Sequence, residues 1–427
     1  MATIFDLDDE FDFEDDEITF SDEDFETNEY IKNEKKAIEL VSKIVSCEKR
    51  NIANSNRLKK IDNLLDCEML GALKYVRLIN ESTLQLELTN IGKKLYEWKK
   101  YNVLKNKALV GIGGKFSAGK SKFINSLLNT DELLLPENQN PTTSIATYIV
   151  KGEQQKIQIF TNDNNMCDID LEALNALTHS FYEKYHIGFS NLVDCVVVQE
   201  PNMQFEDIVF MDTPGYSKAD NFEGLENIGT VSDKEKAKNQ LQGVDYLIWI
   251  VDIENGEIST SDIDFMKTLK IVSSVLIVLN KSDKKTDDDI QRTIQKVELT
   301  MQSSGIQCYG VTAYSSLSGE EWNSNMITNF LNGISNERKS KIDIRLRLHE
   351  IEKSIDIELN EKLKICKKEN QNLFNTIYES DNVLEIKSLV DLYGDSNEEY
   401  RNLLLCKTIH ERNVEELERE IAQYYED

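Results

Sequence analysis

The sequence is poor in basic residues relative to acidic ones, and this imbalance excludes several classes of function. Its 49 Lys and Arg stand against 77 Asp and Glu, which gives a formal net charge of −28. Recognition of a nucleic-acid backbone needs a dense cationic surface, so the balance argues against nucleic-acid binding. It also argues against broad electrostatic docking to anionic lipid, although one local basic patch would suffice for a peripheral contact.

Paired cysteines and apolar segments of membrane length are also missing. The seven cysteines are scattered and never form a C-x-x-C pair, which is typical of reduced thiols and not of a disulfide framework or a zinc site. Apolar runs such as VDYLIWIVDI are too short to span a bilayer. The N-terminus lacks the basic and apolar regions of a secretory signal. We therefore expect a cytoplasmic location, with any membrane contact peripheral at the inner face.

The first 29 residues alternate acidic side chains with phenylalanine and contain no Lys or Arg. Repulsion between the carboxylates predicts that residues 1–29 form an acidic disordered tail. Two interpretations stay open. The tail either keeps the protein in solution, or its phenylalanines form a short motif that binds a partner or a basic surface of the protein itself.

Hydrophobic periodicity predicts helices on both sides of a central region. Residues 30–104 carry an apolar stripe at spacings of three and four, and residues 336–427 carry a second one. After a turn at YGDS, a further helix is expected from about Asn397 to Tyr425. Helices before and after a compact domain can pack together, which predicts an antiparallel bundle, or neck. The stripes are Leu84, Leu88, Ile91, Leu95 and Trp98, and Ile344, Leu348, Ile351, Ile355, Leu359 and Leu363.

The central region, residues 105–335, contains short continuous apolar runs: KALVGIG, SIATYIV, DIVFMD, VDYLIWIVDI and SSVLIVLN. Continuous runs are typical of strands that helices cover on both faces. The predicted fold class is therefore α/β, a phosphate-binding-loop domain with a mostly parallel sheet beside the helical bundle. A long insertion, about 151–205, is expected to hold an extra strand pair and a polar helix over 171–185.

The stretch GKFSAGKS is a complete phosphate-binding loop between a predicted strand and a predicted helix. Its glycines, Gly114 and Gly119, let the backbone N–H groups point at the β-phosphate. Lys120 is expected to reach the β- and γ-phosphates, and Ser121 to ligate Mg²⁺. The predicted nucleotide-binding set of this loop also includes Ala118 and Lys122.

Two further motifs are expected at the γ-phosphate. In FMDTPG, Asp212 is placed to hold Mg²⁺ through water, and the Gly215 N–H to sense the γ-phosphate. In NPTTSIAT, Thr143 is predicted to bind Mg²⁺ through its hydroxyl and to hold the attacking water through its backbone, with Thr142 as the alternative.

The stretch LNKSD selects the base. A carboxylate such as Asp283 can accept two hydrogen bonds from the N1–H and exocyclic amine on one edge of guanine. Adenine does not present this pair of donors. Asn280 is expected to brace the loop, and the stem of Lys281 to cover the base. The predicted ligand is therefore GTP. In VTAYS, the backbone N–H groups of Thr312 and Ala313 are expected to reach the guanine carbonyl.

A general base is missing from these motifs. Tyr216 follows DTPG, where many small GTPases use a glutamine to orient water. Ser117 is expected to hold the β–γ bridge region and a monovalent cation. Hydrolysis would then depend on positioning and electrostatic stabilisation, completed by a second copy of the domain.

Taken together, these motifs resemble those of bacterial dynamin-like GTPases of the dynamin superfamily. The resemblance covers about residues 107–333, and Ser117 to Ser121 is its most specific part, because dynamins coordinate a cation at the serine before Ala-Gly-Lys-Ser. It implies GTP hydrolysis, a homodimer through the nucleotide faces, and a helical neck that GTP turnover moves, often to remodel membrane.

The resemblance also leaves questions open about partners. The helical region after residue 335 is shorter than the stalk of full-length members, so a partner protein is expected to supply that stalk. The alternative function is a GTP-switched scaffold that binds another protein and has no lipid role. A ribosome-assembly GTPase has the same motif order but would need a basic surface.

Overall fold

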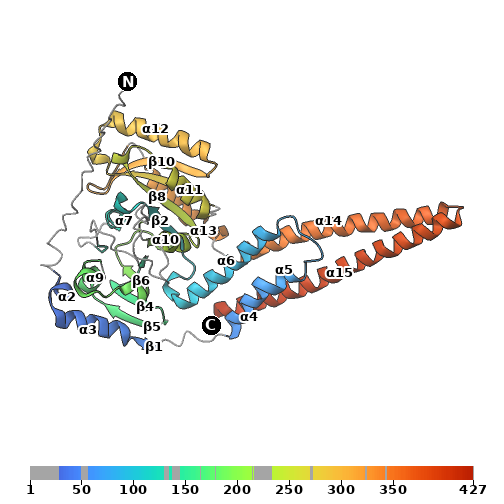
Figure 1. The fold of residues 1–427 in the computed structure, drawn as a ribbon, viewed down its shortest axis with the longest axis horizontal. Coiled ribbons are helices and arrows are strands. Elements are labelled where there is room, and N and C mark those ends of the chain that lie inside the picture. The colour runs from blue at the N-terminus through green and yellow to red at the C-terminus, as the bar shows by residue number, and fades with distance from the viewer. Residues whose placement is uncertain are drawn as a thin grey trace, which may run out of the picture.

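The computed structural model describes residues 28–49, 56–128, 134–136, 145–163, 165–177, 179–213, 215, 233–269, 273–322, 325–341 and 344–426. The predictions made for the acidic tail before residue 28, for Thr142 and Thr143, and for Tyr216 lie outside the described residues. The described chain forms an α/β domain from which long helices extend (Figure 1).

One mixed sheet lies at the centre of the α/β domain, and its described strands follow the order β1-β5-β4-β6-β3-β7-β2-β8-β9-β10-β11. Strands β7, β2, β8, β9 and β10 run parallel. Strand β3 is antiparallel to β7, and β6 is parallel to β3. The strands are β1 Glu48–Lys49, β2 Ala108–Gly114, β3 Ala146–Lys151, β4 Lys156–Thr161, β5 Asn165–Ile169, β6 Val193–Glu200, β7 Ile208–Asp212, β8 Tyr246–Asp252, β9 Val275–Asn280, β10 Cys308–Ser315 and β11 Glu320–Glu321.

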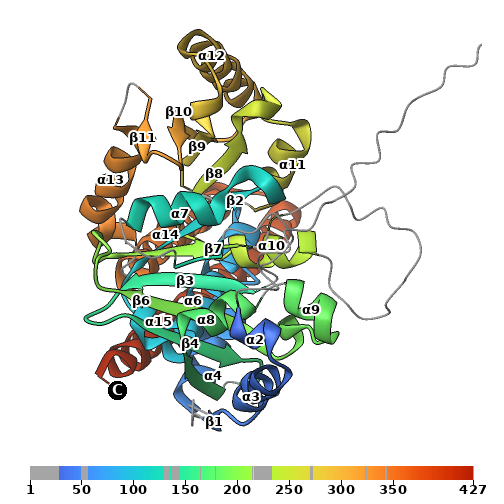
Figure 2. The ribbon, with the colours of Figure 1, turned by 90° about the vertical axis from the view of Figure 1, so that its left-hand side faces the viewer.

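The central strands are buried along their whole length, since every residue of β2, β7, β8 and β9 is buried. Helices on both sides of the sheet account for this burial (Figure 2). This confirms the α/β class and the mostly parallel sheet, which the continuous apolar runs predict. The helices of this part are α7 Lys120–Leu128, α10 Asp233–Leu241, α11 Thr260–Leu269, α12 Asp287–Ser304 and α13 Met326–Lys341.

The insertion extends the sheet at one edge. Strands β4 and β5 form an antiparallel pair that continues from β6. The polar helix expected over 171–185 is two shorter helices, α8 Leu171–Ala176 and α9 His179–Tyr185. Asp170 caps the first of them by accepting a hydrogen bond from the Ala173 N–H, and Leu177 leaves helical geometry at its end.

Residues 28–49, here called the N-terminal segment, pack on the insertion. The segment comprises α2 Glu29–Lys32, α3 Glu34–Val45 and β1, which pairs with β5. The Tyr30 hydroxyl donates to Asp170 at 2.9 Å, and the Lys184 ammonium donates to the Ile31 carbonyl at 2.6 Å. The structure therefore places only the later part of the predicted neck segment, 30–104, in the bundle.

That later part packs on the two C-terminal helices. Helices α4 Asn56–Asn63, α5 Met69–Gly71 and α6 Glu81–Lys100, with a π-helical turn over Leu64–Glu68, contact α14 Ile344–Glu379 and α15 Val383–Glu426. Both predicted apolar stripes are buried, on α6 and on α14. Burial of these stripes confirms the predicted antiparallel bundle of segments from before and after the α/β domain.

The predicted turn at YGDS is wrong. Helix α15 runs unbroken through these residues, and the chain reverses between Glu379 and Val383 instead. A glycine inside a helix costs about 1 kcal/mol relative to alanine, but the turns around Gly394 pack on α14. Tyr393 contacts Phe374 there, with ring centroids 6.3 Å apart.

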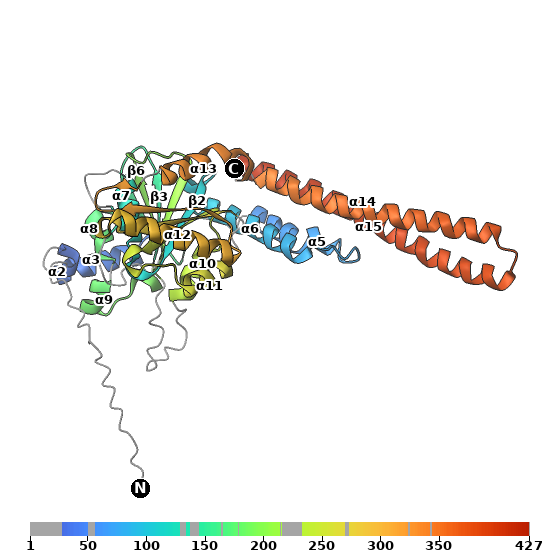
Figure 3. The same cartoon turned by 90° about the horizontal axis from the view of Figure 1, so that it is seen from above.

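The α14–α15 hairpin is long. At 1.5 Å per residue, the 36 residues of α14 make a rod of about 54 Å. Its distal part extends beyond α4, α5 and α6 as a pair of helices alone (Figures 1 and 3). The chain therefore carries a two-helix projection of its own. None of the described helices combines the length and the apolar character that crossing a bilayer requires.

Candidate functional site

The phosphate-binding loop lies between β2 and α7, and two of its glycines are required by their surroundings. Gly114 has φ +145°, and a Cβ there would sit 2.3 Å from the carbonyl oxygen of Ile250. Gly119 has φ +82°, and a Cβ there would sit 2.6 Å from Nδ2 of Asn280. Only glycine fits both the left-handed backbone and this close packing. The loop can therefore curl tightly enough to point its N–H groups inward.

Lys120 at the start of α7 and Asp212 at the end of β7 are both buried. Burial lowers the pKa of Lys120 to about 8, although the charge of Asp212 opposes this shift. Burial likewise raises the pKa of Asp212, while Lys120 and the Ser121 hydroxyl oppose the shift. The Lys120 ammonium donates to the Lys115 carbonyl at 3.3 Å. An added phosphate would supply this buried lysine with anionic partners in addition to Asp212.

Two of the residues expected at the metal, Ser121 and Asp212, lie side by side. The Ser121 hydroxyl donates to Oδ2 of Asp212 at 2.6 Å. The other carboxylate oxygen of Asp212, Oδ1, is buried without a hydrogen-bond partner among the described residues. A hydroxyl, a carboxylate and an unsatisfied buried oxygen are the donors that Mg²⁺ prefers, directly or through water. The residues present therefore fit a magnesium ion here.

Gly215 lies directly over the phosphate-binding loop. A Cβ on this residue would sit 2.5 Å from Cα of Phe116 and 2.9 Å from Nζ of Lys120. The backbone after Asp212 therefore approaches the loop as closely as sterics allow. Thr213 fixes this approach, because its hydroxyl donates to the Ile112 carbonyl of β2 at 2.7 Å.

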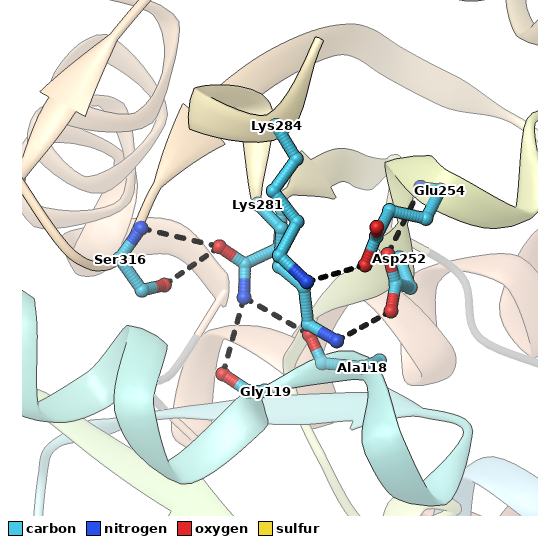
Figure 4. Close-up of polar contacts among 8 residues, drawn as sticks. Ala118, Gly119, Asp252, Glu254, Lys281, Lys284 and Ser316 are labelled. Carbon is cyan, nitrogen blue, oxygen red and sulfur yellow. Dashed lines mark hydrogen bonds and ion pairs between the residues drawn. The ribbon is translucent and has the colours of Figure 1, made fainter.

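Asn280 joins the phosphate-binding loop to the loop after β10. Its Nδ2 donates to the carbonyls of Ala118 at 2.9 Å and Gly119 at 3.4 Å. Its Oδ1 accepts from the N–H and the hydroxyl of Ser316, at 3.2 Å and 2.7 Å. These bonds connect Ser316 on one side with the phosphate-binding loop on the other (Figure 4). Asn280 is 1% exposed, so the bridge is shielded from water.

Lys281 and Asp283 follow Asn280 at the rim of the same site. The Lys281 ammonium donates to Oδ2 of Asp252 at 2.5 Å, which holds its stem across the loop (Figure 4). One oxygen of Asp283, Oδ1, accepts from the Ser315 hydroxyl at 2.6 Å. This hydrogen bond orients the carboxylate that was predicted to recognise guanine.

The structure does not bring Thr312 and Ala313 to that rim. Both lie inside β10, in register with Val278 and Leu279 of β9, and the Thr312 hydroxyl donates to Glu321. The residues that reach the loop of Asn280 and Asp283 come later in the chain. They are Ser315 and Ser316, and their signal in the sequence is the hydroxyl pair that follows the last apolar strand.

The other loop residues differ in exposure. Ser117 is exposed at the tip, in the short 3₁₀ turn Phe116–Ala118. Ala118 is buried, and Lys122 is half-buried in the first turn of α7.

Lys115 makes contacts that its sequence position does not suggest. Its ammonium donates to the Ser259 hydroxyl at 2.8 Å and pairs with Asp262 at 3.3 Å. Asp262 is 3% exposed and also accepts from the Ser259 backbone at the start of α11. The phosphate-binding loop is thus anchored to the start of α11 as well as to Asn280 at the end of β9. Sequence patterns contain no signal for this anchor, because the partners are separated by more than a hundred residues.

Among the described residues, no group of three or more His, Cys, Asp and Glu side chains is placed to hold a metal ion.

Comparison with known proteins identifies the domain that carries this site. Residues 110–282 match the model of the dynamin family. The match begins in β2 and ends in the loop after β9, so it includes the phosphate-binding loop, Asp212 and Asn280. A search of curated protein sequences gives no match.

Solved structures resemble the chain at low identity. One, titled "An oligomerised bacterial dynamin pair provides a mechanism for the long range sensing and tethering of membranes", is 17% identical, with a TM-score of 0.40, over 81% of this chain and 50% of that chain. The chain thus spans half the length of that structure. A second structure of nearly the same title is 15% identical, with a TM-score of 0.40, over 91% of this chain and 82% of that chain.

A structure of Era in complex with MgGDPNP and 16S ribosomal RNA nucleotides is 17% identical, with a TM-score of 0.32, over 53% of this chain and 57% of that chain. Each of these is a likeness of fold. The family match is the more specific finding, because it covers the strands and loops that surround the site. Within the α/β domain, residues 110–282 are therefore similar to the dynamin family, and this similarity covers the strands and loops that carry the site.

Proposed function

We propose that the protein is a Mg²⁺-dependent GTPase that binds GTP through the loops around Asn280. One observation carries the proposal. The buried side chain of Asn280 ties the phosphate-binding loop to the segment that orients Asp283, so phosphate and base would be recognised by one connected unit. We assign Lys120 to the β- and γ-phosphates, Asp283 to the guanine edge, and the stem of Lys281 to the face of the base.

The proposed metal ligands are Ser121 and Thr143 directly, and Asp212 through water. The unsatisfied Oδ1 of Asp212 supports this assignment, because a metal-bound water would give it a partner. The ion supplies positive charge that offsets the negative charge developing on the phosphates. The Ser121 hydroxyl donates its hydrogen to Asp212, and the lone pairs of its oxygen would remain available to ligate the ion.

We propose that hydrolysis depends on positioning and not on a general base. Ser117 at the exposed tip of the loop is assigned to the β–γ bridge region and to a monovalent cation. The backbone of Thr143 is assigned to the attacking water, and Gly215 to the γ-phosphate. Since Ser117 is exposed, a second copy of the domain could cover it and exclude water from the site.

The helical bundle is the proposed output of this cycle. Helix α6 leads through Asn102–Leu104 into β2, the strand that carries the phosphate-binding loop. Two ion pairs fix its C-terminal part on the sheet domain, Lys94 with Asp245 and Lys100 with Asp194. Asp245 also accepts a hydrogen bond from the Leu109 N–H of β2. A movement of β2 on nucleotide binding would therefore be transmitted to α6.

We further propose that the α14–α15 hairpin serves as a short stalk, at a peripheral site on the inner membrane face or on a partner protein that extends it. The dynamin family is the reason to test lipid. A GTP-switched scaffold without a lipid role is the competing outcome.

Two measurements test these proposals. GTP turnover per molecule should rise with protein concentration if a second copy completes the site, and a constant rate would refute this. Lys120→Ala should abolish turnover at every concentration and serves as the control. Sedimentation with liposomes of mixed anionic composition should occur with a non-hydrolysable GTP analogue and not with GDP. Protein that stays in the supernatant in both states would exclude the membrane role and favour the scaffold.

A further inference from the structure

Two cysteines meet where the N-terminal segment joins the sheet. Strands β1 and β5 are antiparallel, with Glu48 opposite Met166 and Lys49 opposite Asn165. Continued by one residue, the same register places Cys47 opposite Cys167. Directly opposed residues of an antiparallel pair point their side chains to the same face of the sheet.

The separation at such a position suits a disulfide. Opposed Cα atoms in antiparallel pairs lie about 4.5 to 5.5 Å apart, and disulfides span Cα separations of about 4.4 to 6.8 Å. Cys47 is 8% exposed, while Cys167 is half-buried. The pKa of the Cys167 thiol is raised to about 12, mainly by burial and then by the hydrogen bond with Cys47 and the Cys47 charge. The Cys47 thiol donates to the Lys43 carbonyl at 3.4 Å, and its effect on the pKa of Cys167 is consistent with the two thiols lying near each other.

We propose that Cys47 and Cys167 form a reversible disulfide that fastens the N-terminal segment to the β4–β5 hairpin. The oxidant is a low-molecular-weight disulfide, such as oxidised glutathione. Deprotonated Cys167, the more accessible of the two, attacks one sulfur of that molecule and releases one thiolate. The Cys47 thiolate then attacks the Cys167 sulfur of the mixed disulfide and releases the second. The protein loses two protons and two electrons, and the oxidant gains them to become two thiols.

The structural consequence concerns the bundle. The N-terminal segment is held on the insertion by contacts at partly exposed groups, such as Tyr30 with Asp170 and Lys184 with the Ile31 carbonyl. A covalent bond at Cys47 would prevent the segment from leaving. Helix α4 begins seven residues after Lys49, which pairs with Asn165, so the bond would keep the start of the bundle within about 30 Å of β5. Under reducing conditions such a bond would be reversed by thiol–disulfide exchange.

The test uses the full chain, reduced or treated with oxidised glutathione at several pH values, followed by peptide mapping under non-reducing conditions. The expected product is a peptide that links Cys47 to Cys167, with the loss of two hydrogens. Because the attacking thiol is protonated at neutral pH, the linked peptide should form about tenfold faster for each unit by which the pH is raised. In the oxidised protein, hydrogen exchange in the α3 amides should slow by about tenfold or more.

Matched variants separate this pair from general thiol oxidation. Cys47→Ser and Cys167→Ser should each abolish the linked peptide and leave the remaining thiol as a glutathione adduct. Cys67→Ser, at an exposed thiol of the bundle, should leave the link intact. Absence of the linked peptide from oxidised wild-type protein, with adducts or intermolecular links in its place, would overturn the proposal. Neither readout involves GTP, so the result is independent of the proposed GTPase activity.

Discussion

Replacing Asn280 by alanine would remove the bridge between the phosphate-binding loop and the segment after β10. The side chain makes three well-formed hydrogen bonds, to the Ala118 carbonyl and to the N–H and hydroxyl of Ser316, and a longer one to the Gly119 carbonyl. A hydrogen bond contributes about 0.5 to 1.5 kcal/mol net, and a buried group that loses its partner costs more. The three good bonds together therefore contribute about 2 to 4 kcal/mol.

Because the bridge sets the relative position of the two loops, we expect its loss to appear in GTP affinity. A loss of about 2 to 4 kcal/mol corresponds to affinity reduced by roughly 30- to 1,000-fold. Titration with a fluorescent GTP analogue, in the presence of Mg²⁺, measures this directly. Ser316→Ala is the matched control, since it removes a single bond, and it should reduce affinity by only about fivefold.

A double-mutant cycle decides whether the bridge itself is responsible. In the Asn280→Ala background, Ser316→Ala should have almost no further effect, because the hydroxyl has already lost its partner. Thermal unfolding of the nucleotide-free proteins separates lost affinity from lost folding. The reasoning would be refuted if the Asn280→Ala protein is folded and its affinity for the analogue is within about threefold of wild type. Three buried hydrogen bonds should contribute more free energy than such a small change in affinity represents.

Three further predictions concern charge, base recognition and packing. Phosphate binding favours protonated Lys120, so GTP affinity should be constant below pH 8 and fall by up to tenfold per pH unit above it. Calorimetry should show proton uptake when GTP binds in the upper part of this range. An affinity that stays constant up to pH 9.5 would contradict the low pKa of Lys120. Asp283→Asn should reduce the preference for GTP over ATP by about tenfold or more, measured by competition, and unchanged preference would exclude its role in base recognition. Leu88→Ala, at a fully buried position of α6, should lower the free energy of unfolding by about 2 to 5 kcal/mol, measured with denaturant. Leu86→Ala, on the exposed face of the same helix, should lower it far less. Equal effects of the two substitutions would contradict the bundle packing.

Much of the fold could be predicted because its signals are local. Continuous apolar runs predicted the buried strands β2, β7, β8 and β9, since a strand covered on both faces has no polar side. Spacings of three and four predicted the stripes that α6 and α14 bury. The predicted turn at YGDS was wrong because its signal was local and the outcome depended on tertiary packing. A local preference of Gly394 against helix was outweighed by packing of its neighbours on α14, which no local pattern contains.

In the candidate site, too, some features follow from local sequence and others depend on the tertiary structure. The phosphate-binding loop is contiguous in the chain, and its spacing alone places glycines where positive φ is required and a lysine and a serine at the start of α7. The roles of Ser315 and Ser316, and the anchor of Lys115 on Ser259 and Asp262, depend on strands that come together only in the sheet.

The sequence by itself determined the α/β class, the order of the nucleotide motifs and the helical stripes, because spacing along the chain encodes each of these. Only the tertiary structure decided that Asn280 bridges two loops, that the N-terminal segment docks on the insertion, and that Cys47 lies opposite Cys167. These features join residues far apart in the chain. Their geometry is set by strand register and by burial, and no stretch of sequence contains either one alone.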